Sequence, residues 1–204
     1  MGFYSTVVLP RLLDRVMSNP EMAKYRQILL KDVTGDVLEI GFGSGLNLAY
    51  YPSYIDKLTT VDANAGMNKL AQKRIQASEI NVENRVLNGE RLPMNSDHFD
   101  CVVSTWTLCS IAQVNQALQE IHRVLKPGGK FFFIEHGLSD DPKIQTWQNR
   151  LNPFQKVIGD GCNLNRNIQA LVEQQFESVT LERFDMESLP RVGSHTYKGV
   201  AIKG

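Results

Sequence analysis

Short apolar runs alternate with segments of helical periodicity along this chain of 204 residues, as far as residue 136. The apolar side chains of Met67, Leu70 and Ile75 recur at the spacing of one helix face, whereas residues 130–135 form a continuous apolar run typical of a buried strand. This alternation predicts eight elements. We expect strands at residues 36–40, 58–62, 82–87, 99–104 and 130–135, and helices at residues 46–51, 65–77 and 114–125.

Alternating strands and helices indicate an α/β fold, because helical crossovers between parallel strands cover both faces of a sheet. Beyond residue 136 the pattern changes. Residues 142–158 and 167–175 are helical in pattern, and residues 179–184 and 196–202 predict two strands joined by a loop. The predicted fold is a doubly wound, Rossmann-like sheet of seven strands, mostly parallel, with an antiparallel hairpin at its C-terminal end.

The chain is expected to form a single domain, residues 1–204, in three parts. Residues 1–31 are mostly helical in pattern, with interruptions at Pro10 and Pro20. This part is interpreted as a lid over the acceptor pocket, an N-terminal extension or a membrane-surface helix, with simple docking onto the core as the alternative. Residues 32–136 are the predicted ligand-binding core, and residues 137–204 supply further helices and the hairpin.

The charge balance and the cysteines narrow the class of protein. The 22 basic and 22 acidic residues give a net charge of zero, so we expect no nucleic-acid partner. No apolar run is long enough to predict an integral membrane segment. The three cysteines form no CxxC pair, which favours a reducing compartment and predicts a cytoplasmic protein. The oligomeric state stays open.

A glycine cluster lies where the first predicted strand meets the first predicted helix. Gly41, Gly43 and Gly45 allow the main chain to approach a ligand closely. Their spacing is GxGxG, whereas the dinucleotide fingerprint GxGxxG would need a glycine in place of Leu46. A carboxylate at Glu39 would repel a pyrophosphate and favour the amino and sulfonium end of a cationic ligand.

Asp62 ends the second predicted strand, 23 residues after Glu39. A carboxylate in this position can accept hydrogen bonds from both hydroxyls of a ribose. A strand-end turn is the structural alternative. Together with the glycine cluster, Asp62 predicts a nucleoside-containing ligand.

Five motifs now lie in a characteristic order. The ExGxGxG run from Glu39, the strand-end Asp62 and residues 88–93, 99–103 and 124–129 resemble the class I S-adenosylmethionine-dependent methyltransferases of the type-11 branch. This resemblance implies a Rossmann-like fold, S-adenosylmethionine as the cofactor and S-adenosylhomocysteine as the product.

A narrower similarity extends into the second half of the chain. Residues 107–111, 133–136 and 160–164 resemble the methyltransferase-like 7 proteins, which are thiol S-methyltransferases, and their bacterial relatives. The implied activity is methyl transfer to a small-molecule or lipid acceptor. A thiol, a phenol or quinone precursor, and an amine all remain open as the accepting group.

The resemblance also implies a role for each matching residue along the cofactor. Gly41, Gly43 and Gly45 are expected to line the methionine side, and Asp62 is expected to hold the ribose. Asn88 and Gly89 are expected to contact the adenine, and the backbone around Ser104 and Thr105 to face the methionine amino group. Glu39 is also an expected cofactor-binding residue.

His136 is the predicted catalytic residue. It follows the last parallel strand, at the carboxyl edge of the sheet, and histidine can act as a general base near neutral pH. A backbone hydrogen bond at the strand end is the structural alternative. Cys109 and Cys162 are interpreted as small apolar residues near the pocket. No group of His, Cys, Asp or Glu has metal-ligand spacing, so no metal site is predicted.

Two other functions compete with methyl transfer. A nicotinamide-dependent oxidoreductase would use the same strand-end carboxylate, but Leu46 and Glu39 disfavour it. A non-catalytic domain could retain the cofactor-binding fold without activity, and the intact glycine cluster and Asp62 argue against it.

Overall fold

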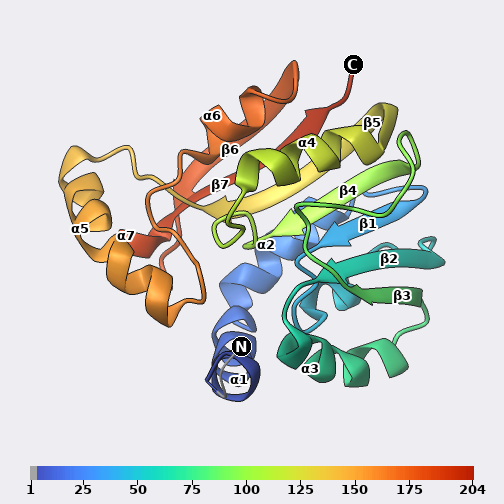
Figure 1. Ribbon diagram of the computed structural model, residues 1–204, viewed down its shortest axis with the longest axis horizontal. Coiled ribbons are helices and arrows are strands. Elements are labelled where there is room, and N and C mark those ends of the chain that lie inside the picture. The colour runs from blue at the N-terminus through green and yellow to red at the C-terminus, as the bar shows by residue number, and fades with distance from the viewer. Residues whose placement is uncertain (1–3) are drawn as a thin grey trace.

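The apolar runs predicted as strands form one seven-stranded sheet in the computed structural model, which describes residues 4–204 (Figure 1). The strand order is β3-β2-β1-β4-β5-β7-β6. The strands are β1 (Val37–Ile40), β2 (Lys57–Asp62), β3 (Asn81–Val86), β4 (Phe99–Thr105), β5 (Leu125–His136), β6 (Ser178–Asp185) and β7 (His195–Ile202).

Strand directions agree with the predicted topology. The pairs β1–β2, β1–β4, β2–β3 and β4–β5 are parallel. The last strand, β7, inserts between β5 and β6 and pairs antiparallel with both. The doubly wound α/β fold with an antiparallel C-terminal hairpin is therefore confirmed. The chain order of the parallel strands reverses beside β1, and open sheets of this kind bind ligands at the carboxyl edge near such a point.

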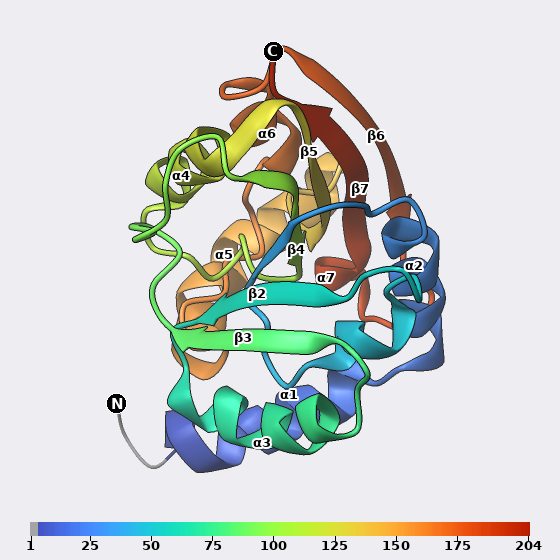
Figure 2. The same cartoon turned by 90° about the vertical axis from the view of Figure 1, so that its right-hand side faces the viewer.

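Helices cover both faces of the sheet (Figures 1 and 2). Phe131 and Phe133 pack with α4 and α6 on one face, and Phe132 and Ile134 pack with α2, α3 and the short helix η2 on the other. Successive strand residues point to opposite faces, which explains why this run is apolar throughout. The helices are α2 (Pro20–Leu30), η2 (Leu46–Tyr50), α3 (Ala65–Gln76), α4 (Val114–Val124) and α6 (Ile168–Glu173).

The predicted helical N-terminal part is present as η1 (Tyr4–Val8), α1 (Leu9–Met17) and α2; its first three residues lie outside the described part of the chain. Pro10 and Pro20 stand in the first turns of α1 and α2. The interruption predicted at Pro20 is present, since α1 ends at Met17 and Pro20 begins α2, where a proline loses no helical hydrogen bond. Pro10 follows the change from η1 to α1 at Leu9. In Figure 2, α1 lies beside α3 below the sheet.

Two boundaries differ from the sequence prediction. The helix expected at residues 46–51 is a short 3₁₀ helix ending at Tyr50, two residues before Pro52. Strand β5 begins at Leu125, ahead of the Pro127-Gly128-Gly129 turn, because Leu125 already pairs with Phe99 before the register shifts.

The C-terminal part adds α5 (Pro142–Ile158) and α7 (Arg191–Ser194) around the hairpin. Among the described helices, none has the length and apolar character needed to span a bilayer. The division of the chain into one domain with three parts stays a prediction.

Candidate functional site

A cavity of about 830 Å³ opens at the carboxyl ends of β1, β2, β4 and β5. The glycine loop and Asp62 form one side of it, and the loop after β4 and the end of β5 form the other. Helices α1 and α5 complete the wall. The predicted site residues that line it are Glu39, Gly41, Gly43, Asp62, Asn88, Gly89, Thr105 and His136.

The glycine loop has a main chain that only glycine adopts easily. Gly41 and Gly43 have φ angles of 76° and 58°, in the left-handed region. A Cβ on Gly41 would lie 1.9 Å from the Thr107 hydroxyl oxygen, whereas a Cβ on Gly43 would meet no heavy atom closer than 3.9 Å. Gly41 is therefore required for packing against the loop after β4, and Gly43 keeps open the space in which a ligand can approach.

Asp62 holds the glycine loop against the end of β2. Its two carboxylate oxygens accept hydrogen bonds from the backbone N–H groups of Gly43 and Asn64, each at 2.7 Å. Burial raises the pKa of Asp62, and these two hydrogen bonds lower it in part. The free lone pairs of the same oxygens can accept hydrogen bonds from a diol.

Glu39 lies under the loop, 1% exposed, in a network of buried polar groups. One carboxylate oxygen accepts from Asn47 Nδ2 at 2.9 Å and the other from the Tyr51 hydroxyl at 2.7 Å. Asn47 also donates to Thr105 Oγ1 at 3.1 Å and accepts from Arg26 Nε at 3.0 Å. Burial raises the pKa of Glu39 to about 8.

Of the other predicted cofactor residues, some line the cavity and others do not. The Asn88 side chain is exposed, and its carbonyl oxygen accepts from the Glu90 backbone N–H at 3.0 Å. Gly89 is buried, and a Cβ there would lie 2.9 Å from Ile40. Gly45 and Ser104 do not line the cavity: Gly45 caps η2, and the Ser104 hydroxyl faces Glu135 at 3.4 Å.

Polar contacts join α1 to the glycine loop. Asp14 Oδ1 accepts from the Ser44 hydroxyl at 2.5 Å and lies 2.9 Å from Arg74 Nη1 on α3. Leu13 and Met17 of the same helix line the cavity. The N-terminal part therefore covers the ligand-binding edge of the sheet, as a lid would.

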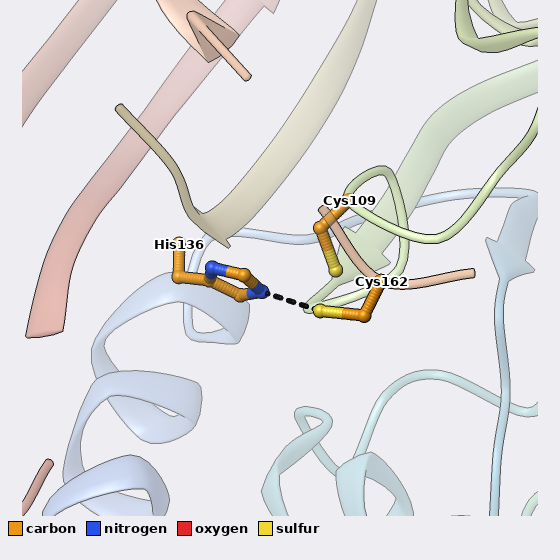
Figure 3. Close-up of side chains that lie close together, drawn as sticks. All are labelled: Cys109, His136 and Cys162. Carbon is orange, nitrogen blue, oxygen red and sulfur yellow. Dashed lines mark hydrogen bonds between the residues drawn. The ribbon is translucent and has the colours of Figure 1, made fainter. Parts of the chain in front are cut away.

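His136 lies on the opposite side, in a corner with two cysteines (Figure 3). Its Nε2 is 3.1 Å from Cys162 Sγ, and the Cys109 sulfur points toward the same space. Burial lowers the pKa of His136, but the Cys162 thiol and the Glu135 carboxylate outweigh it, so the pKa lies above its ordinary value. A hydrogen bond with Cys109, together with burial, holds the pKa of Cys162 well above its ordinary value.

Glu135 orders the loop that carries Cys109. It is fully buried and accepts hydrogen bonds from the backbone N–H groups of Thr107 at 2.6 Å, Leu108 at 2.8 Å and Cys109 at 3.4 Å. Its side chain lies on the opposite face of the sheet from that of His136, because neighbouring residues of a strand point to opposite faces. Burial raises its pKa, and the backbone hydrogen bonds oppose that effect.

Comparisons with known proteins identify the family. A family model described as a methyltransferase domain matches residues 38–133. Thiol S-methyltransferase TMT1B of Rattus norvegicus is 39% identical over 179 residues, which cover 78% of this chain and 70% of that protein. TMT1B of Homo sapiens is 34% identical over 218 residues, covering 98% and 85%. The chain belongs to this methyltransferase family.

Solved structures agree with the fold of the methyltransferase. A SAM-dependent methyltransferase from Aquifex aeolicus superposes with a TM-score of 0.66 over 96% of this chain and 98% of that one, at 16% identity. The cofactor is S-adenosylmethionine and the product S-adenosylhomocysteine, as the sequence predicted. The alternative function, a nicotinamide-dependent oxidoreductase, is therefore set aside.

Sequence reasoning missed several residues of the methyltransferase site. Arg26, Asn47 and Tyr51 carry the Glu39 network, but each lies in a helical or turn segment with no motif of its own. Cys109 and Cys162 were interpreted as apolar residues, although they converge on His136. The only signal for them was their place in segments that resemble thiol methyltransferases.

Proposed function

We propose that this methyltransferase transfers the methyl group of S-adenosylmethionine to the sulfur of a small, apolar thiol. The observation that carries the proposal is the corner of Cys109, His136 and Cys162, which puts a basic nitrogen beside sulfur at the edge of the cavity. Two curated relatives, 39% and 34% identical to this chain, are named thiol S-methyltransferases, which supports the same acceptor.

The cofactor is proposed to lie along the glycine loop. Asp62 would accept the ribose hydroxyls, Gly89 and Asn88 would border the adenine, and Gly41 and Gly43 would lie along the methionine part. Glu39 would act through Asn47, since both of its oxygens already accept hydrogen bonds. In this arrangement Gly45 and Ser104 support the loops without contacting the cofactor. The Thr105 backbone would still face the methionine amino group.

The apolar wall supports an apolar acceptor. The side of the cavity between α1 and α5 is lined by aliphatic and aromatic side chains, whose burial by a ligand contributes about 25 cal/mol per Å². No acidic or basic side chain of α5 lines this wall among the described residues. The apolar lining residues are Leu9, Leu13, Val16, Met17, Leu151, Phe154 and Ile158.

The reaction is an in-line displacement at the methyl carbon. The leaving sulfonium becomes a neutral thioether, so positioning the thiol can supply much of the rate enhancement. The acceptor must lose its proton before or during attack. We propose His136 as the catalytic residue, because its Nε2 already lies at 3.1 Å from a sulfur and can accept the proton of an acceptor thiol in the same way.

A direct test is a methyl-transfer screen with radiolabelled S-adenosylmethionine. We expect labelling of alkyl thiols and no comparable labelling of phenols or of phosphatidylethanolamine vesicles. Labelling of a phenol or an amine, with thiols left unlabelled, would overturn the thiol assignment. Calorimetry with S-adenosylhomocysteine, run in parallel, shows whether protein that labels none of these acceptors still binds the cofactor.

His136→Gln tests the proposed catalytic residue. We expect turnover with the labelled thiol to fall by about 10²- to 10⁴-fold, the usual contribution of a positioned acid or base, while S-adenosylhomocysteine affinity stays unchanged. His98→Gln is the matched control, because His98 is exposed before β4 and outside the cavity. Equal turnover of the His136→Gln variant and the wild type would exclude the role.

We further propose that the protein acts in the cytoplasm on a small molecule and not on a nucleic acid. The three free cysteines support a reducing compartment. The net charge of zero supports an acceptor other than a polyanion.

A further inference from the structure

Three potential metal ligands meet in the corner that the proposed function assigns to the acceptor. Cys109 Sγ, Cys162 Sγ and a ring nitrogen of His136 all lie within 4.8 Å of one another. In Figure 3, the two sulfur atoms and Nε2 point toward one common space. The three residues come from three separate segments, the loop after β4, the end of β5 and the loop after α5. The spacing of these residues along the sequence therefore could not predict that they lie together.

The loops that carry the two cysteines are fixed to each other. Both the backbone N–H and the side-chain Nδ2 of Asn163 donate to the carbonyl oxygen of Cys109, at 3.0 and 2.9 Å. Arg166 donates to the carbonyl oxygen of Leu108. On the other side, Glu135 holds the Cys109 backbone N–H. The corner is therefore rigid before any ligand arrives, as a binding site requires.

The three atoms lie close enough together to bind one tetrahedral zinc ion after small shifts. Zinc–sulfur and zinc–nitrogen bonds of about 2.3 and 2.0–2.1 Å place neighbouring ligand atoms about 3.5 to 3.8 Å apart. The distance of 3.1 Å between His136 Nε2 and Cys162 Sγ would have to open by about 0.5 Å. Two sulfurs and one imidazole are also a donor set that zinc prefers.

We propose that Cys109, His136 and Cys162 bind one Zn²⁺ ion whose fourth position opens into the cavity. All three residues line that cavity, and no other His, Cys, Asp or Glu of the described chain joins the group. Structural zinc sites are closed by four protein ligands, whereas catalytic sites have three and leave one position for substrate. The geometry therefore points to a substrate-binding ion.

Charge around the corner is compatible with an ion bound by two thiolates. Two thiolates and one Zn²⁺ have no net charge, so the cost of burying them is far below that of an unpaired ion. The Arg166 guanidinium is close enough to interact electrostatically with both cysteines. The carboxyl of Glu135 faces the backbone of the neighbouring loop, where it does not compete as a ligand.

The consequence for catalysis rests on the proposed function. An acceptor thiol that enters the fourth position loses its S–H proton to water and forms a zinc–sulfur bond. Its sulfur then attacks the methyl carbon, and the carbon–sulfur bond of the sulfonium breaks with its electron pair left on S-adenosylhomocysteine. The thioether product is a weak ligand and leaves. With the ion bound, His136 is a ligand, and the ion takes over the activation of the thiol.

The decisive measurement is the metal content of the full chain. Protein purified without chelator from zinc-containing medium is expected to carry about one zinc ion per chain. Zinc removed by dialysis is replaced with Co²⁺, whose thiolate charge-transfer band and intense visible absorption report a tetrahedral sulfur site. Cys109→Ala, His136→Ala and Cys162→Ala should each lower affinity for Co²⁺ at least tenfold, while Cys101→Ala, a buried cysteine in the core, should not.

Other outcomes would overturn the site. If the wild-type protein shows no cobalt spectrum, the metal site is excluded. Equal Co²⁺ affinity in all four variants would exclude it as well. A thiol titration of the unfolded protein without reductant that finds one cysteine in place of three would identify a Cys109–Cys162 disulfide instead. S-adenosylhomocysteine binding by calorimetry shows that each variant is folded. Thiol methylation that persists after complete zinc removal would reject the catalytic ion while leaving the proposed function intact.

Discussion

Each half of the cavity is built around one buried carboxylate, and the two are held in different ways. On the side proposed for the cofactor, called the cofactor side below, Glu39 accepts hydrogen bonds from the side chains of Asn47 and Tyr51, 8 and 12 residues further along. On the side proposed for the acceptor, called the acceptor side below, Glu135 accepts from backbone N–H groups of a loop 26 to 28 residues earlier in the chain. Glu39 therefore fixes its sequence neighbours, whereas Glu135 fixes a distant segment.

This difference predicts how each half responds to change. The cofactor side is mostly one continuous segment, from Glu39 to Tyr51, closed by Asp62. The acceptor corner exists only when β4, β5 and the loop after α5 are all docked. Substitutions in the acceptor corner should therefore reduce global stability, and those on the cofactor side should act first on ligand affinity.

The largest expected effect is that of Glu135→Ala. It leaves the buried N–H groups of Thr107 and Leu108 without an acceptor, each at a cost of about 1–3 kcal/mol. We expect the free energy of unfolding, measured in urea, to fall by about 3–5 kcal/mol. Glu135→Gln keeps one acceptor oxygen and should lose roughly half as much. Glu79→Ala, at an exposed turn, is the control and should change little. A loss below that of the glutamine variant would mean that water replaces the carboxylate.

Asp62→Ala tests the cofactor side. Removing a charged acceptor of the ribose hydroxyls should weaken S-adenosylhomocysteine binding by about 1.5–3 kcal/mol, which is roughly 10- to 150-fold in calorimetry. Asp56→Ala, just before β2 and far from the cavity, is the matched control. Unchanged affinity in the Asp62 variant would reduce Asp62 to its structural contacts with Gly43 and Asn64.

The sequence predicted that the glycine loop and Asp62 lie together at the edge of the sheet, because their signals are local. Glycine at positions 41 and 43 follows from positive φ angles, and Asp62 follows from its place at a strand end. The alternation of strands and helices likewise predicted the doubly wound sheet with its antiparallel C-terminal hairpin, but it did not predict that β7 lies between β5 and β6. Each of these inferences needs only the spacing of nearby residues and the rules of strand connection.

The acceptor corner could not be predicted in the same way. His136 was found from its strand end, but Cys109 and Cys162 carry no spacing that relates them to it. Their convergence depends on Asn163, which pairs with Cys109 across a separation of 54 residues. The Arg26–Asn47–Glu39 network escaped prediction for the same reason, since Arg26 comes from a helix outside the motif.

Glu39→Gln sharpens the comparison through pH. The pKa of Glu39 is about 8 in the folded protein, against an ordinary value of 4.5, so the folded chain holds a proton that the unfolded chain releases between those pH values. Its contribution to stability is complete below pH 4.5 and is lost as pH rises toward 8. Relative to Glu39→Gln, which cannot titrate, the wild type should lose about 1.4 kcal/mol of unfolding free energy per pH unit in that window.

Urea unfolding of both proteins at pH 6 and pH 7 measures this slope. Equal pH dependence in the two proteins would mean that Glu39 stays ionised, with Arg26 as its counter-ion. The cofactor side would then contain a buried ion pair between Glu39 and Arg26.

The smallest expected effect is that of Asp14→Asn, which loosens the lid. The Asp14–Arg74 pair is partly exposed, and such pairs contribute about 0.2–1 kcal/mol. We therefore expect S-adenosylhomocysteine to dissociate about two- to fivefold faster in stopped-flow measurements, with little change in unfolding free energy. The wild-type rate should rise with salt toward that of the variant, because added ions screen the pair. Asp32→Asn, on an exposed turn after α2, is the control. A dissociation rate that does not respond to Asp14→Asn would show that α1 is a fixed wall of the cavity, so that acceptor and cofactor enter by another route.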